Sequence, residues 1–176
     1  MCKFILLDTC NNRSLHYTNK VQRCFNRYAK YLQDDFSHGE KDIISYISNI
    51  PFFYIILSYD NEFMGFVYLD NFVGDDKNNY SAELTTCFEP HAWGTFTRYS
   101  AKFFLKKAFD EFGLYKIKAY VFPDNYRTSV LLKSSGFEYE TTLKKETVRK
   151  NKLQDIDIYA IYRTYYYKNE VKYEQY

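Results

Sequence analysis

The sequence predicts a single domain of the mixed α/β or α+β class, built around one sheet. Its 176 residues suit one domain, and neither an internal repeat nor a Pro/Gly-rich linker divides them. Hydrophobic residues make up 46%, which supplies a sizeable core. The hydrophobic pattern predicts, in order, a strand, two helices, three strands, a helix, a strand, a helix and two strands. We therefore expect residues 1–176 to form one domain.

The first fifty residues are predicted to hold one short strand and two helices. Residues 3–8 form an apolar run typical of a short strand. Residues 14–36 are predicted to be helical because large apolar side chains recur at intervals of three and four residues: Val21, Phe25, Tyr28, Tyr31 and Leu32. A second helix is predicted over residues 39–50, where Pro51 stops it.

Three extended segments follow. Residues 52–60 and 62–72 flank Asp60-Asn61, a favourable hairpin turn. Residues 80–89 are the third extended segment, which Pro90 ends.

A long helix is predicted from about Thr95 to Phe112, with Gly113 as its C-terminal cap. Its core stripe is expected to consist of Ala101, Phe104, Leu105, Ala108 and Phe112. Its solvent-facing stripe is expected to consist of Arg98, Lys102, Lys106 and Asp110.

The last third is predicted to hold three strands and a short helix. Residues 115–122 alternate, with Ile117, Ala119 and Val121 facing inward and Lys116 and Lys118 outward. Residues 126–135 form a helix that ends at Gly136, with Phe137 packed just beyond it. Residues 138–148 and 155–167 are expected to form a terminal hairpin joined by residues 151–155.

Composition argues against several classes of function. The net charge of +2 gives no electrostatic basis for nucleic-acid binding. No segment has the length of a membrane span, and the apolar start is too short for a secretion signal, so we expect a cytoplasmic protein. The four cysteines, at positions 2, 10, 24 and 87, show no metal-binding spacing and are expected to be reduced, mostly buried thiols. No metal is expected.

Four motifs occur in order between residues 50 and 165. Glu83 is followed seven residues later by Pro90 and then by Trp93-Gly94. A helix-to-strand step, "AFDEFGLYKIKAYVFPDN", ends at Asn125. The third motif consists of Asn125, Thr128, Leu132, Gly136 and Phe137, and the fourth of Asn151, Asp155 and Tyr159. Together they resemble the GNAT superfamily of acyl-CoA-dependent N-acyltransferases, nearest to its ribosomal-protein-alanine acetyltransferase branch.

The resemblance implies a GNAT fold, with a mixed, mostly antiparallel sheet of about six to seven strands flanked by helices. It implies acetyl-CoA as co-substrate and a primary amine as acceptor, either a protein N-terminus or a small molecule. The acceptor itself is unknown from the sequence. A homodimer is compatible with the resemblance.

The chain departs from the family pattern at two places. The family usually carries Q/R-x-x-G-x-G/A where its long helix begins. The two small positions fall at Phe96 and Arg98 in one register and at Thr95 and Thr97 in the other, and we prefer the second. The family's usual general-acid tyrosine falls at Leu132, so that role is vacant.

The cofactor residues follow from the resemblance. It implies that the pantetheine arm pairs with Cys87, Phe88 and Glu89, and that Asn125 holds the pantetheine amides. Gly94 allows the turn, and the helix start presents backbone N–H groups to the pyrophosphate. The contributing residues are Thr95, Phe96, Thr97 and Arg98, with the threonine hydroxyls and the guanidinium adding contacts and Phe96 turned inward. The alternatives are that Thr95 merely caps the helix, that Arg98 heads a solvated stripe, and that Asn125 is a turn residue.

The resemblance also implies that the active site opens on the strand face that Glu83 shares with Thr85 and Cys87. A partly buried carboxylate there can take the amine proton, so Glu83 is the candidate general base. The alternative is a plain solvent-facing glutamate. Thr128 is the candidate for the leaving thiolate, with Tyr126 and Tyr139 behind it. His91 lies in the loop and is expected to have no role.

Three interpretations stay open. The first is an active N-acetyltransferase. The second is a catalytically inactive GNAT-fold protein that binds acyl-CoA or a partner. The third is an unrelated α/β domain that mimics the motifs.

Overall fold

A computed structural model of the chain describes residues 2–7, 16–32, 49–75 and 77–173, with side chains up to Lys168. The predicted helix over residues 39–50 lies outside these residues except for its last two. In chain order the elements are β1 (Cys2–Leu6), α2 (Thr18–Tyr28), η1 (Ala29–Tyr31), β2 (Phe52–Ser58), β3 (Phe63–Gly74), β4 (Asn79–Phe88), η3 (Pro90–Ala92), α4 (Thr95–Glu111), β5 (Lys116–Val121), α5 (Tyr126–Ser134), β6 (Glu138–Arg149), β7 (Lys152–Tyr162) and α6 (Arg163–Tyr173).

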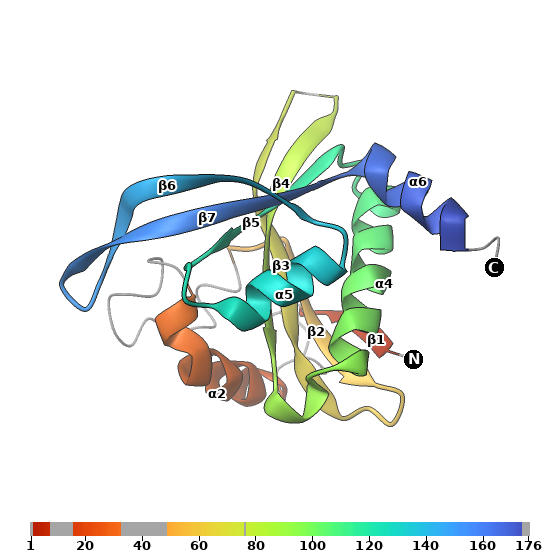
Figure 1. Cartoon of the computed structure of the whole chain (residues 1–176). Coiled ribbons are helices and arrows are strands. Elements are labelled where there is room, and N and C mark those ends of the chain that lie inside the picture. Colours follow the sequence, from red (N-terminus) through yellow and green to blue (C-terminus); the bar gives the residue numbers. More distant parts are fainter. Residues whose placement is uncertain (1, 8–15, 33–48, 76, 174–176) are drawn as a thin grey trace. The chain divides into compact units, whose positions relative to one another are not determined.

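The described strands form a seven-stranded mixed sheet in the order β1-β2-β3-β4-β5-β7-β6 (Figure 1). The β4–β5 pair is parallel, whereas the β1–β2, β2–β3, β5–β7 and β6–β7 pairs are antiparallel. This sheet, with its helices, confirms the predicted fold class.

The chain divides into two compact units. The first unit comprises Met1–Asp70 and Thr85–Ser100, and the second comprises Asn71–Leu84 and Ala101–Tyr176. Strands β3 and β4 and helix α4 each contribute residues to both units.

The first unit packs α2 against the sheet through a shared apolar cluster. Val21, Cys24 and Phe25 of α2 are buried at the three- and four-residue spacing that the sequence predicts. On the sheet side, the Phe53 ring stacks on Phe66 at 5.2 Å and on Tyr68 at 5.3 Å between ring centroids. Such aromatic pairs add to the gain from apolar burial.

Gly65 of β3 is required by the close approach of β4 in the same unit. A side-chain Cβ at this position would lie 2.2 Å from the carbonyl oxygen of Cys87 and 2.9 Å from Cα of Phe88. Both contacts are to backbone, which cannot move aside as the end of a flexible side chain can. Only glycine therefore lets β3 lie against this end of β4.

The second unit is organised around β5. In it, β4 pairs with β5 from Ser81 to Glu83, while β7 pairs with β5 along its whole length. Ile117, Ala119 and Val121 of β5 are buried, and Lys116 and Lys118 face the other side, as the alternation predicts.

Helix α5 ends in the cap that the sequence predicts. The amide of Gly136 donates to the carbonyl of Lys133 at 3.1 Å, and that of Phe137 donates to the carbonyl of Leu132 at 3.0 Å. Gly136 has a φ of 93°, and Phe137 is buried just beyond it. These paired bonds form a Schellman cap, which uses glycine for its left-handed residue.

Three sequence expectations need correction in the second unit. The core stripe of α4 includes the fully buried Phe109, whereas Ala101 and Phe112 are only half-buried. The β6–β7 loop is only the two-residue turn Lys150–Asn151, both with positive φ, rather than residues 151–155.

The third correction concerns residues 163–167, which form the start of α6 and not the end of a strand. β5 begins at Lys116, opposite Tyr162, so β7 has no further partner in that ladder beyond this pair. The amide of Arg163 instead donates to the carbonyl of Tyr115 at 2.9 Å. Tyr166 then packs on Phe109, with 5.3 Å between ring centroids, and its hydroxyl donates to the carbonyl of Lys102.

We expect Gly65→Ala to destabilise the protein by about 2–3 kcal/mol, because the added Cβ collides with fixed backbone. Gly113→Ala is the matched control. Gly113 also has a positive φ, of 66°, but a Cβ there would meet nothing within 4 Å. This control should therefore cost only about 1 kcal/mol, the penalty of left-handed backbone. Chemical denaturation measures both values, and equal losses would contradict the steric argument.

Candidate functional site

The turn that joins β4 to α4 has a fixed backbone in the first unit. The amide of Ala92 donates to the carbonyl of Glu89 at 2.9 Å, and the amide of Trp93 donates to that of Pro90 at 3.3 Å. Gly94 follows with a φ of 105°, and a Cβ there would meet nothing within 4 Å. This open left-handed glycine lets the chain reverse into α4, as the sequence predicts.

The start of α4 presents backbone donors. The first intrahelical bond runs from the amide of Arg98 to the carbonyl of Gly94, at 3.2 Å. The amides of Thr95, Phe96 and Thr97 precede this bond, and helix geometry leaves such groups without an intrahelical acceptor. The expectation that the Arg98 amide also faces phosphate is wrong, because that amide already closes the first turn.

Thr97 and Phe96 both differ in burial from what the sequence suggests. Thr97 is only 6% exposed, and its hydroxyl donates to the carbonyl of Ala92 at 2.6 Å. Its side chain therefore fastens the turn to the helix instead of facing a phosphate. Phe96 is half-buried rather than turned fully into the core.

Thr95 and Arg98 are both exposed at this helix start. The Arg98 guanidinium forms no ion pair within the described part of the chain. Arg98 lies in the first turn of α4, at the end of the helix that carries partial positive charge.

The end of β4 is tied to β3 and to the turn through Glu89. Its amide donates to the carbonyl of Met64 at 2.9 Å, and its carbonyl accepts from Ala92. Because both backbone groups are bonded, we drop Glu89 from the residues that could pair with a pantetheine arm.

The alternation of a strand determines which residues at this end of β4 direct their backbone groups away from β3. Alternate residues of a strand direct their N–H and C=O groups to opposite sides. Since Glu89 faces β3, Cys87 does so too, whereas Thr86 and Phe88 face the other edge. The backbone groups on the edge away from β3 therefore belong to Phe88, which the sequence analysis named, and to Thr86, which it did not, whereas those of Cys87 face β3.

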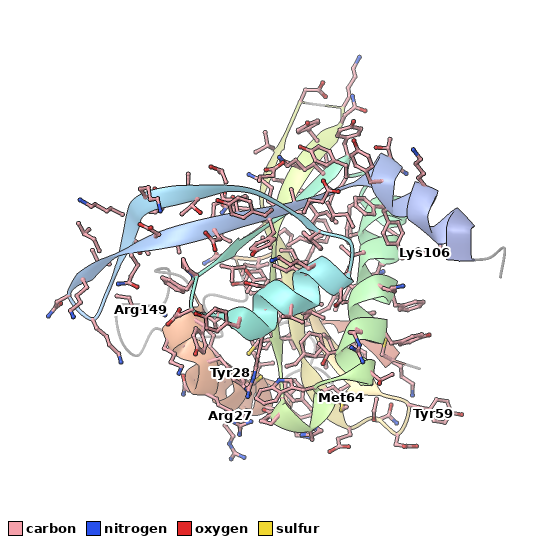
Figure 2. All side chains as sticks on the ribbon, in the orientation of Figure 1. Arg27, Tyr28, Tyr59, Met64, Lys106 and Arg149 are labelled. Atoms are coloured by element: carbon pink, nitrogen blue, oxygen red, sulfur yellow. The ribbon has the colours of Figure 1, made fainter. Side chains whose placement is uncertain are left out.

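Helix α2 holds the same end of β4 through side chains. The Sγ atoms of Cys24 and Cys87 lie 3.4 Å apart, both buried. Arg27 and Tyr28 are adjacent residues of α2 (Figure 2). Arg27 forms an ion pair with Glu89, and Tyr28 packs against Trp93 with 6.2 Å between ring centroids. The hydrogen bond with Cys24, together with burial, raises the pKa of the Cys87 thiol.

Tyr28 places its phenol oxygen out of reach of solvent in this group of contacts. Burial raises the pKa of Tyr28, and its hydroxyl has no hydrogen-bond partner within the described residues. The ring supplies packing area, while the unsatisfied hydroxyl carries a desolvation cost.

Glu83 lies in the second unit, where two side chains orient it. Its Oε2 accepts a hydrogen bond from Nδ2 of Asn71 at 2.9 Å, and its Oε1 lies 3.5 Å from Nζ of Lys118. The Glu83 and Lys118 side chains are 22% and 19% exposed, so Glu83 is not a plain solvent-facing glutamate. Asn71, with a φ of 46°, was not singled out from the sequence.

The β4–β5 ladder ends at this carboxylate. Glu83 pairs with Lys118 in the last registered pair, and Leu84–Phe88 have no partner in that ladder. The edge-facing backbone groups of Thr86 and Phe88 belong to this unpaired stretch.

Asn125 and Thr128 lie at the start of α5, in the second unit. Asn125 is the N-cap residue, but its side chain makes no capping hydrogen bond. Its backbone carbonyl accepts from the amide of Ser129 at 3.2 Å. Thr128 is half-buried, and Leu132 is buried at the position of the family's tyrosine.

Two further side chains, those of Tyr139 and His91, already have partners. The Tyr139 hydroxyl lies 2.7 Å from that of Thr142, which in turn donates to Asp157 at 2.6 Å. Nε2 of His91 lies 3.4 Å from Oε1 of Glu62. Tyr126, the other weak candidate, is 74% exposed.

Within the described ranges, no three His, Cys, Asp or Glu side chains are grouped as they would be to hold a metal. None of the described helices has both the length and the apolar character needed to cross a membrane.

No protein-family model matches the sequence, and comparison with curated proteins gives no match. Solved structures do match its fold. A mutant spermidine/spermine N-acetyltransferase from Vibrio cholerae has a TM-score of 0.74 at 18% identity, covering 96% of this chain and 98% of that one. A GNAT-family acetyltransferase from Bacillus anthracis has a TM-score of 0.72 at 17% identity, covering 92% and 94%. RimJ from Mycobacterium smegmatis, in complex with CoA-disulfide, has a TM-score of 0.70 at 17% identity, covering 85% and 79%. The chain has the GNAT fold.

Proposed function

We propose that this chain is a GNAT-type N-acetyltransferase that transfers the acetyl group of acetyl-CoA to a primary amine, nearest to the ribosomal-protein-alanine acetyltransferase branch. The observation that carries the proposal is the exposed start of α4, which follows directly on an open glycine turn. Fold neighbours solved in complex with CoA or CoA-disulfide support the same cofactor.

The pyrophosphate binds at the start of α4. Phosphate oxygens accept from the amides of Thr95, Phe96 and Thr97, and the helix dipole favours their negative charge. Arg98 adds a charge-assisted bond from its side chain. Thr97 contributes only its amide, because its hydroxyl holds the turn.

The pantetheine arm pairs with the edge-facing groups of Thr86 and Phe88, as a short added strand would. The side-chain amide of Asn125 binds a pantetheine amide. Its lack of a capping bond supports this role, because a buried or half-buried amide gains most from a specific partner.

Glu83 removes the proton from the acceptor ammonium, directly or through one water. The bond from Asn71 to Oε2 fixes the carboxylate, so that Oε1 can accept the proton. The neutral amine then attacks the thioester carbonyl, and the thiolate of CoA leaves and takes up a proton. Leu132 has no proton to give, and Thr128 is the hydroxyl that we assign to the thiolate.

The first prediction concerns the backbone donors. Thr95 is the first residue of α4, a position where proline fits a helix without strain. Thr95→Pro should therefore fold with an unchanged Tm but bind acetyl-CoA about 5- to 10-fold more weakly, because one N–H is lost. Thr95→Ala, which keeps that N–H, is the control. Calorimetric affinity measures the difference, and equal Kd values for both variants would remove the amide from the site.

The second prediction concerns the guanidinium. Arg98→Ala should weaken acetyl-CoA binding about 10- to 100-fold and flatten its salt dependence, since a charge-assisted bond to phosphate is lost. Arg23→Ala removes the same charge from an exposed position on α2 and serves as control. If both variants bind like the parent, Arg98 is only the top of the solvent-facing stripe of α4.

The third prediction tests catalysis. Glu83→Gln should lower kcat by about 100-fold with little change in acetyl-CoA affinity, because the base is lost while the shape is kept. Glu140→Gln is a matched control, since Glu140 is likewise paired with a lysine, Lys116, and lies in the same unit. Release of free CoA thiol measures turnover, with an alanine-initiated peptide, spermidine and an amino sugar as acceptors. Binding of acetyl-CoA without turnover on any acceptor would favour the inactive alternative.

A further inference from the structure

Cys24 and Cys87 bring two buried sulfurs together in the first unit. They are 63 residues apart in the chain, yet their Sγ atoms lie 3.4 Å apart. The Cys87 thiol also lies 3.7 Å from the carbonyl oxygen of Cys24. Neither sulfur is bonded to another at present.

The two elements that carry these cysteines are already held in register. Arg27 lies one helical turn after Cys24 on α2, and Glu89 lies two residues after Cys87. These two residues form an ion pair next to the pair of sulfurs. Tyr28 packs on Trp93 beside this pair. These contacts, together with the apolar cluster around Cys24 and Cys87, limit how far the sulfurs can move apart.

An S–S bond measures about 2.05 Å, so the sulfurs need to approach by only about 1.4 Å. Side-chain rotation at two cysteines supplies a shift of this size. A metal is a poorer explanation of the pair, because no third ligand joins them within the described residues.

We propose that Cys24 and Cys87 form a reversible intramolecular disulfide when the protein meets a peroxide. The peroxide oxidises one thiol to a sulfenic acid, and the O–O bond breaks with release of one water. The second thiol then attacks the sulfenic sulfur, which forms the S–S bond and releases a second water. Two thiols are thus oxidised by two electrons in all, and one peroxide is reduced to two waters.

The bond links α2 covalently to the end of β4 in the first unit. It closes a long loop in the unfolded chain, so it should stabilise the folded protein. The disulfide itself does not depend on the proposed function. Because both thiols are buried, we expect oxidation to be slow compared with that of a small free thiol.

The test uses the full chain, reduced, desalted and then treated with hydrogen peroxide that catalase later removes. The protein is then denatured in the presence of iodoacetamide, which alkylates every free thiol. Intact mass counts the alkylated thiols, and peptide mapping identifies the linked cysteines. Two of the four thiols should become protected, dithiothreitol should restore them, and the map should link Cys24 to Cys87. The oxidised protein should melt about 5–10 °C higher than the reduced protein.

Two variants sharpen the assignment. Cys2→Ser, which removes another buried thiol, should still form the bond. Cys87→Ser should instead leave a sulfenic acid at Cys24 that dimedone traps. Four alkylated thiols in the treated parent, a link that involves Cys2 or Cys10, or sulfinic acids at Cys24 and Cys87 without a link would each overturn the proposal. The peptide map of the parent decides the matter even where a variant fails to fold.

Discussion

The change of hydrogen-bond partners along β4 is the constraint on which the candidate site depends. Within the second unit, Ser81–Glu83 pair with β5, and the registered ladder stops there. Within the first unit, the other end of the strand is held to β3 through the bond from Glu89 to Met64 and through the close approach at Gly65. The edge of β4 that faces β3 is held in this way, so the backbone stays extended beyond Glu83, where the other edge has no partner in the β5 ladder. An extended edge of this kind is suited to pair with an extended ligand.

The carboxylate at the end of the ladder is positioned by neighbours and not by burial alone. Lys118 stands beside Glu83 because the two residues are register partners, and Asn71 reaches Glu83 from β3. A second Glu–Lys pair, Glu140 with Lys116, lies on β6 and β5, and Tyr162 donates a hydrogen bond to that glutamate at 2.8 Å. The Lys116 and Tyr162 bonds lower the pKa of Glu140 despite its burial. Both glutamates thus have two side-chain partners, but the lysine contact differs: Nζ of Lys116 lies 2.6 Å from Oε1 of Glu140, whereas Nζ of Lys118 lies 3.5 Å from Oε1 of Glu83.

The turn before α4 shows how a helix start can keep a fixed backbone with a single glycine. A helix start offers N–H groups whatever its side chains are, so long as they are not proline. What the loop then needs is a way to hold its shape, and here the buried Thr97 hydroxyl bonds the carbonyl of Ala92. Gly94 is the one residue of the turn that needs a left-handed backbone. Of the polar residues here, Thr97 holds the turn, whereas Thr95 and Arg98 face solvent.

The sequence by itself determined most of the elements and the order in which they occur. Residue periodicity predicted α2, α4 and β5, because a buried stripe repeats along one helix or strand and needs no knowledge of its neighbours. Turn chemistry predicted the Gly136-Phe137 cap and the bend at Asn61, since these conformations depend on a few adjacent residues. Motif order predicted the GNAT fold and the strand that carries Glu83.

Only the tertiary structure decided which groups are already engaged. Periodicity could not show that the Glu89 backbone is bonded to Met64, that Asn71 reaches Glu83, or that Cys24 meets Cys87, because each contact joins segments far apart in the chain. The same reason explains residues 163–167, whose aromatic content suits a strand. There the β5 ladder ends at Tyr162, and packing of Tyr166 on Phe109 favours a helix. Local preference is weak, and the partner supplied by the fold overrides it.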